Sequence, residues 1–275
     1  MGSITPREGF DFGAQLNLQD PKDRELLCFV LSQALYGEAT GVYCGKSLYA
    51  AQSLEAARFY LRQARQELNH LELFADIFRS LELQPMPAHW VIKLLSAHNN
   101  YYPLKVLMEH AFGEGMVLDI FRDVLLQVLP DDDPRIPDIK KKLAVVCREE
   151  EEHIAWGEKE TMRLMQVSPW LRWPFYGILE WQMLLAPQVA WAVGRMGVDH
   201  PILKRLPAFV GAVQKKLWKQ GQALGIVPAE RPGLPTRLFA MTWAVLLFLR
   251  SQFARSNSRL EKNYLSELGF TPGTP

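Results

Sequence analysis

Apolar residues recur at the three- and four-residue spacing of amphipathic helices along most of this 275-residue chain. No stretch of useful length alternates with the two-residue period of a strand, and breaks rich in Pro, Ser and Asp separate the helical segments. The pattern therefore predicts an all-α protein. Helices are expected at residues 20–51, 53 to beyond 78, 88–97, 103–129, 137–166, 170–196, 201–224 and 236–268.

The ends of the predicted helices carry local signals. Asp20 and Pro21 suit the cap and first position of one helix, and Ser53 suits the cap of the next. Proline-rich breaks follow at residues 84–87 and 130–134. These signals indicate where helices begin and end more firmly than the apolar pattern does.

Composition narrows the class of protein. Apolar residues make up 48% of the chain, which is ample for a buried core. Cys28, Cys44 and Cys147 have no Cys-x-x-Cys spacing, so they are expected to be reduced core residues. Reduced cysteines and an N-terminus without a secretory signal favour a cytoplasmic protein. Peripheral attachment to a membrane remains open. The longest apolar run, residues 238–249, is too short to span a bilayer.

Two Glu-x-x-His motifs, at Glu67–His70 and Glu150–His153, each lie in a long predicted helix. Residues three apart share a helix face, so each motif points a carboxylate and an imidazole in the same direction. A further glutamate, Glu38 or Glu114, stands on the helix before each motif. Two such glutamates and two Glu-x-x-His motifs form the ligand set of di-iron and di-manganese bundles.

The segments Leu35–Gly41, Ala64–Phe74, Glu109–Gly115 and Arg148–Gly157 resemble the ferritin-like di-iron carboxylate superfamily. The last segment is similar to oxygen-activating members, in which an acid precedes the ligand Glu and Ile/Val-Ala-x-Gly follows the His. The resemblance implies a ferritin-like four-helix bundle over residues 20–167, with additional C-terminal helices over 170–275. It also implies two metal ions, Fe2+/Fe3+ or alternatively manganese, held by Glu38, Glu67, His70, Glu114, Glu150 and His153.

The chemistry of this set suits iron or manganese. Four carboxylates neutralise two divalent ions in a buried site, and the absence of thiolate ligands argues against structural zinc. Glu149 resembles the family's acid that holds the histidine of the second helix. His110 is interpreted as a core histidine with a local partner, an extra ligand or proton carrier being the alternative. Asp119 is expected at the surface.

Glycines flank two of the expected ligands: Gly37 and Gly41 beside Glu38, and Gly113 and Gly115 beside Glu114. Glycine within a helix costs about 1 kcal/mol relative to alanine, so their presence needs a reason. A cavity for substrate or oxygen and close helix packing explain them equally well.

The resemblance favours a non-haem di-iron oxygenase, with Glu114 and Glu150 acting in the reaction. Such a monooxygenase would use dioxygen and an electron donor, such as a ferredoxin or reductase, to oxidise a hydrophobic or carrier-linked small molecule. A ferroxidase or iron-storage protein and a di-iron tRNA hydroxylase are the alternatives. Phe74 stands where ribonucleotide reductase small subunits place their radical tyrosine, so a tyrosyl radical is not expected.

The C-terminal part is basic: residues 201–275 hold 11 Lys and Arg against three Asp and Glu. This charge suits an anionic membrane surface, an acidic carrier protein or RNA, and a merely solvated helix face is the default. The Trp- and Leu-rich residues after 170 are expected to pack on the bundle. The sequence leaves open whether the chain forms a homodimer.

Overall fold

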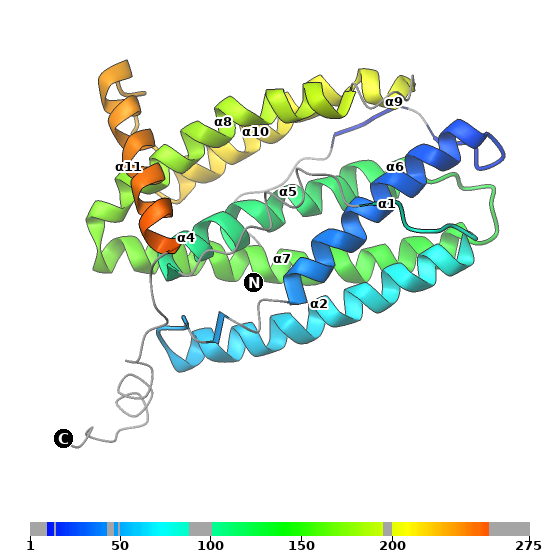
Figure 1. Cartoon of the computed structure of the whole chain (residues 1–275), viewed down its shortest axis with the longest axis horizontal. Coiled ribbons are helices and arrows are strands. Elements are labelled where there is room, and N and C mark those ends of the chain that lie inside the picture. The colour runs from blue at the N-terminus through cyan, green and yellow to red at the C-terminus, as the bar shows by residue number, and fades with distance from the viewer. Residues whose placement is uncertain are drawn as a thin grey trace.

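The computed structural model describes residues 10–13, 15–42, 47–48, 50–87, 101–194 and 200–252, and all regular structure within them is helical (Figure 1). This confirms the all-α prediction for the described residues. The α-helices are α1 (Pro21–Gly41), α2 (Leu54–Ser80), α4 (Tyr102–Lys105), α5 (Glu114–Asp119), α6 (Leu126–Val128), α7 (Ile136–Val167), α8 (Arg172–Gly194), α9 (Pro201–Lys204), α10 (Leu206–Ala223) and α11 (Leu234–Gln252). The other elements are η2 (Val106–Gly113), η3 (Ile120–Leu125) and η4 (Pro169–Leu171).

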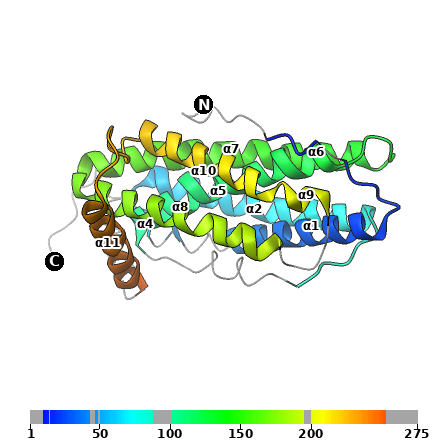
Figure 2. The same ribbon diagram turned by 90° about the horizontal axis from the view of Figure 1, so that it is seen from above.

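Four long rods run side by side: α1, α2, the continuous rod from α4 to α6, and α7 (Figures 1 and 2). α1 packs on α2, α2 packs on α7, and α7 packs on the third rod. Gly157 of α7 allows a close approach, since a Cβ there would lie 2.6 Å from the Cβ of His110. Large apolar side chains that are fully buried fill the space between the rods, among them Phe59, Phe74, Ile77, Phe112, Phe121 and Leu143.

Local sequence signals set the ends of the first two rods. Pro21 is the first residue of α1, and the Ser53 side chain caps α2 by accepting a hydrogen bond from the Ala56 amide at 3.0 Å. The prediction that the first helix reaches residue 51 is wrong, because α1 ends at Gly41. Glycine is a poor helix former, and a Cβ on Gly41 would lie 2.4 Å from Oε2 of Glu67.

The third rod is not a regular α-helix. Its segments η2 and η3 are π-helical, with hydrogen bonds that span five residues instead of four. The expectation that Asp119 lies at the surface is wrong: the side chain is 1% exposed and pairs with Lys216 and Arg122. The cause is the contact with Lys216, which belongs to α10.

A second layer, made of α8, α10 and α11, covers the third rod and α7 (Figures 1 and 2). α8 packs on both α10 and α11, and a Cβ on Gly177 would lie 2.1 Å from the carbonyl oxygen of Ala240. The Gln220 amide of α10 donates to the Ala111 carbonyl oxygen at 2.8 Å and to Oε1 of Glu158 at 2.7 Å. One side chain therefore joins this layer to two of the rods.

Other predictions fall partly outside the described residues. Cys28 and Cys147 are buried free thiols, as expected, whereas Cys44 and the predicted helix at 88–97 lie outside that part of the chain. The last helix is described only as far as Gln252. Among the helices that the structure describes, none combines the length and apolar character needed to cross a bilayer.

Candidate metal centre

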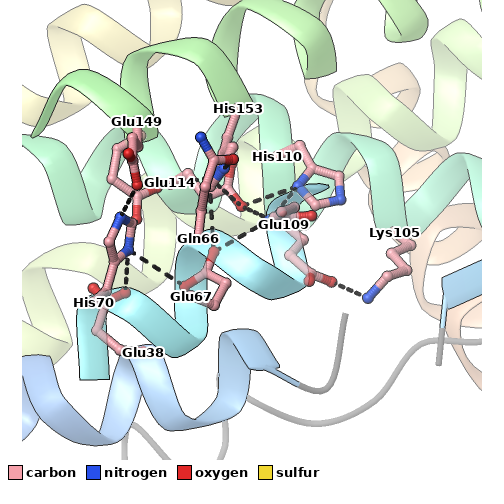
Figure 3. Close-up of polar contacts among 12 residues, drawn as sticks. Glu38, Gln66, Glu67, His70, Lys105, Glu109, His110, Glu114, Glu149 and His153 are labelled. Carbon is pink, nitrogen blue, oxygen red and sulfur yellow. Dashed lines mark hydrogen bonds and ion pairs between the residues drawn. The ribbon is translucent and has the colours of Figure 1, made fainter. Parts of the chain in front are cut away.

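The six predicted ligands come from all four rods. Figure 3 shows that Glu38, Glu67, His70, Glu114 and His153 point toward one another. α1 supplies one residue, α2 two, α7 two, and the third rod one at the start of α5. All six are buried: Glu38, Glu67, His70, Glu114, Glu150 and His153.

The six residues form two overlapping groups, each with one ligand atom per residue and all these atoms within 4.8 Å of one another. Glu67 and Glu150 belong to both groups. The first group adds Glu38 and His70, and the second adds Glu114 and His153. Two shared carboxylates between two sets of private ligands are what a pair of neighbouring, bridged metal ions requires.

Both imidazoles present Nδ1 to the centre. Nδ1 of His70 lies 2.9 Å from Oε2 of Glu38 and 3.6 Å from Oε1 of Glu150. Nδ1 of His153 lies 3.4 Å from Oε2 of Glu150, 3.7 Å from Oε1 of Glu67 and 3.8 Å from Oε1 of Glu114. Nδ1 is therefore the candidate ligand atom of each histidine.

The outward nitrogens of the two imidazoles are held by equivalent positions of the sequence. Nε2 of His70 lies 2.9 Å from Oε2 of Glu149, the contact that the resemblance implies. Nε2 of His153 lies 3.0 Å from Oε1 of Gln66, a residue that the sequence analysis missed. Each partner directly precedes the glutamate of the opposite Glu-x-x-His motif. Such outer contacts fix ring orientation, so both histidines are preset to bind through Nδ1.

Polar atoms without partners fit the same interpretation. Within the described residues, Oε2 of Glu114, Oε2 of Glu150 and Nδ1 of His153 are buried and make no hydrogen bond. An unsatisfied buried polar atom costs about 1–3 kcal/mol and calls for an explanation. Lone pairs of two carboxylates and an imidazole that converge on one place are explained by cations bound there.

In the metal-free protein, protonation of the site residues offsets the negative charge of the buried carboxylates. Burial and repulsion from Glu67 raise the pKa of Glu150 to about 7, and they raise that of Glu38 well above its usual value. Burial opposes protonation of His70, but its hydrogen bonds to Glu38 and Glu67 raise its pKa to about 11. The pKa of His153 is likewise raised to about 9, against burial, by Glu114 and Glu150.

Metal loading at pH 7 is therefore expected to release protons, because His70 and His153 carry them before the metal binds. Calorimetric titration in buffers of different ionisation enthalpy measures this release, which should be two protons from the imidazoles together with those carried by Glu38 and Glu150. Loading with no proton release would contradict the assignment.

In the metal-free protein, the protonated imidazoles stabilise the fold fully below pH 6.5, their ordinary pKa. This stabilisation falls as the pH rises through about 9 for His153 and about 11 for His70.

His110 stands next to the groups but belongs to neither. Its Nδ1 lies 3.0 Å from Oε1 of Glu114 and 3.3 Å from the Gln63 amide nitrogen, as expected of a core histidine with local partners. Gln63, another residue that the sequence analysis missed, also donates to Oε1 of Glu114 at 2.5 Å. The contacts of Glu114 with His110 and Gln63 orient its carboxylate. Nearby, Lys105 pairs with Glu109 (Figure 3).

The flanking glycines have different roles. Gly41 allows close packing against the Glu67 carboxylate, and Gly113 lies against its own helix, where a Cβ would be 2.7 Å from the Met108 carbonyl oxygen. A Cβ on Gly37 would meet no atom of the described residues within 4 Å, so that position borders open space. Close packing therefore accounts for Gly41 and Gly113, and a cavity at the site stays a prediction.

No protein-family model matches this chain, and comparisons with curated proteins and with solved structures give no significant match. What the molecule shows is a mostly helical protein with a buried Glu/His cluster able to hold metal. This much is compatible with a di-iron helical bundle.

Proposed function

We propose that the four rods form a ferritin-like bundle and that the protein is a non-haem di-iron oxygenase. The observation that carries the proposal is the sharing of Glu67 and Glu150 by two groups of buried ligands. Four carboxylates match the charge of two Fe2+ ions, and manganese fits the same donors. Among the residues that the structure describes, neither group contains a cysteine, and this disfavours zinc.

When bound, two iron ions supply the one- and two-electron chemistry that activates dioxygen. The protein's own residues prepare the place for it. Glu149 and Gln66 hold the imidazoles, and Gln63 orients Glu114. Stacked rings of Phe59 and Trp156, 3.7 Å apart, form an apolar wall beside His153. Such a wall excludes water from a reactive centre.

The proposed reaction inserts one oxygen atom into a C–H or N–H bond of a hydrophobic or carrier-linked small molecule. The other oxygen atom leaves as water, using two protons and two electrons from an external donor such as a ferredoxin or reductase. Phe74 is fully buried at the position discussed for a radical tyrosine. This favours oxidation of a bound substrate over generation of a stable protein radical.

Oxygen uptake after anaerobic Fe(II) loading tests the proposal. We expect uptake to stop once about two irons per chain are oxidised, and to resume when reductant and a hydrophobic substrate are supplied. Oxygen electrode traces and iron analysis of the same sample provide the measurement. Iron oxidation that continues far beyond two per chain, in a particle of hundreds of kilodaltons, would show an iron-storage protein instead. Hydroxylation of tRNA by the loaded protein would show the third alternative.

A further inference from the structure

The outward side of α11 is largely apolar, with Thr242 as an exposed polar residue within it. Ala240, Ala244 and Leu247 are buried at the spacing of the face that packs on α8. The opposite side is open, with exposed fractions between 40% and 61% for its large side chains. We call these side chains the α11 face: Leu234, Leu238, Phe239, Val245, Leu246 and Leu249.

This face differs from an ordinary solvated helix surface, which carries polar and charged residues. α11 contains no Asp or Glu, and its only charged residues are Arg237 and Arg250. The Arg237 guanidinium is engaged by Glu180 at 2.8 Å, so the stretch between the two arginines has no charge to hydrate. A contiguous exposed apolar surface of this kind marks an interaction site.

Half-exposed aromatic rings border the α11 face. Trp170 in η4 is 41% exposed, and Trp173 at the start of α8 is 36% exposed. Trp170 stacks on Trp243 with ring centroids 5.9 Å apart. A shallow hollow lined by Trp173, Pro235, Thr236 and Phe239 adjoins them. Tryptophan prefers surroundings that are apolar on one side and wet on the other, as at the boundary of a lipid bilayer.

The charge of the same layer identifies the occupant. Residues 201–252 hold eight Lys and Arg against one acid, Glu230. Arg250, in the last turn of α11, is exposed to solvent at the edge of the α11 face. A helix that lies on the surface of anionic lipid combines leucines, aromatic residues and cations. α11 has these features, and it is too polar or too short to cross a bilayer.

We propose that the α11 face docks in the headgroup boundary of an anionic lipid bilayer, with Leu238, Phe239 and Leu246 inserted and Arg250 near the phosphates. Docking does not depend on the proposed oxygenase function, because it involves no residue of the metal centre. It would give the chain access to hydrophobic molecules dissolved in the membrane.

Flotation of the full chain with vesicles tests this proposal. Vesicles of phosphatidylcholine with roughly a third phosphatidylglycerol should carry the protein upward, and added salt or pure phosphatidylcholine should reduce binding. The variant Leu238→Asp/Phe239→Asp/Leu246→Asp should partition at least about tenfold less, since its apolar insertion is lost. Leu61→Asp/Leu68→Asp is the matched control: both leucines are exposed on α2, away from α11, and binding should be unchanged.

Circular dichroism and metal content of both variants establish that they fold. Tryptophan fluorescence should be quenched by brominated anionic lipid in the wild type and in the control. Failure of the wild type to float, or equal binding by the triple variant, would overturn the proposal. The proposal would also be overturned if no vesicle bound the protein and the triple variant alone disrupted a concentration-dependent dimer or binding to an acidic protein.

Discussion

Glu67→Ala and Glu150→Ala are each expected to remove metal from both positions, reducing the content from about two ions per chain to near zero. Both carboxylates belong to the two ligand groups, so either change removes a donor from each. It also leaves three carboxylates facing four positive charges, which burial makes costly.

Residues private to one group should behave differently. Glu38→Ala affects only the group containing His70, and His153→Ala only the group containing Glu114, so each is expected to retain about one ion per chain. Metal analysis after anaerobic Fe(II) loading and removal of unbound iron gives the stoichiometry. Glu72→Ala, an exposed acid on α2, is the control and should bind like the wild type.

A uniform loss in all four variants would indicate one cooperative site in place of two overlapping ones. Retention of two ions after Glu67→Ala would contradict the metal centre itself. A metal content near zero in the wild type, with the fold intact, would do the same.

Lys216→Met is expected to destabilise the protein by about 3 kcal/mol, measured by urea unfolding of the metal-free chain. Lys216 Nζ lies 3.1 Å from Oδ1 of Asp119 and 2.9 Å from Oδ2 of Asp123, and both acids are almost fully buried. Removing the lysine charge leaves two buried carboxylates with Arg122 as their cation. Methionine preserves most of the side-chain volume, so the loss measures the ion pairs.

Lys215→Met is the matched control, because that lysine is exposed on the same helix; its effect should be within about 0.5 kcal/mol. Asp123→Asn combined with Lys216→Met should lower the free energy of unfolding by less than the sum of the two single changes, because both partners of one ion pair are then removed. Strict additivity would show that the pair does not interact.

Most of the metal centre could be predicted because its information is local. Glu-x-x-His places two ligands on one face wherever the helix is regular, as in α2 and α7, and both motifs meet as the pattern requires. Glu149 could be recognised as an acid beside a ligand. Gln66 occupies the equivalent place, but as an amide it carried no sequence signal, although the doubling of the motif pointed to that position.

What could not be predicted depends on partners that are distant in the sequence. Asp119 is buried through its contact with Lys216 of α10, which is 97 residues away. The apolar spacing continues past Gly41, so it gave no sign that α1 ends there.

The two contacts of Gln220 have a consequence for how the protein opens. Its amide holds the backbone of Ala111, in the same rod as Glu114, and the carboxylate of Glu158, in the same helix as Glu150. If α10 separates from the rods, the Ala111 carbonyl and Glu158 lose a buried donor together. If the candidate centre binds metal, hydrogen exchange in α10 is expected to slow on loading, because bound ions stabilise the closed rods on which α10 packs.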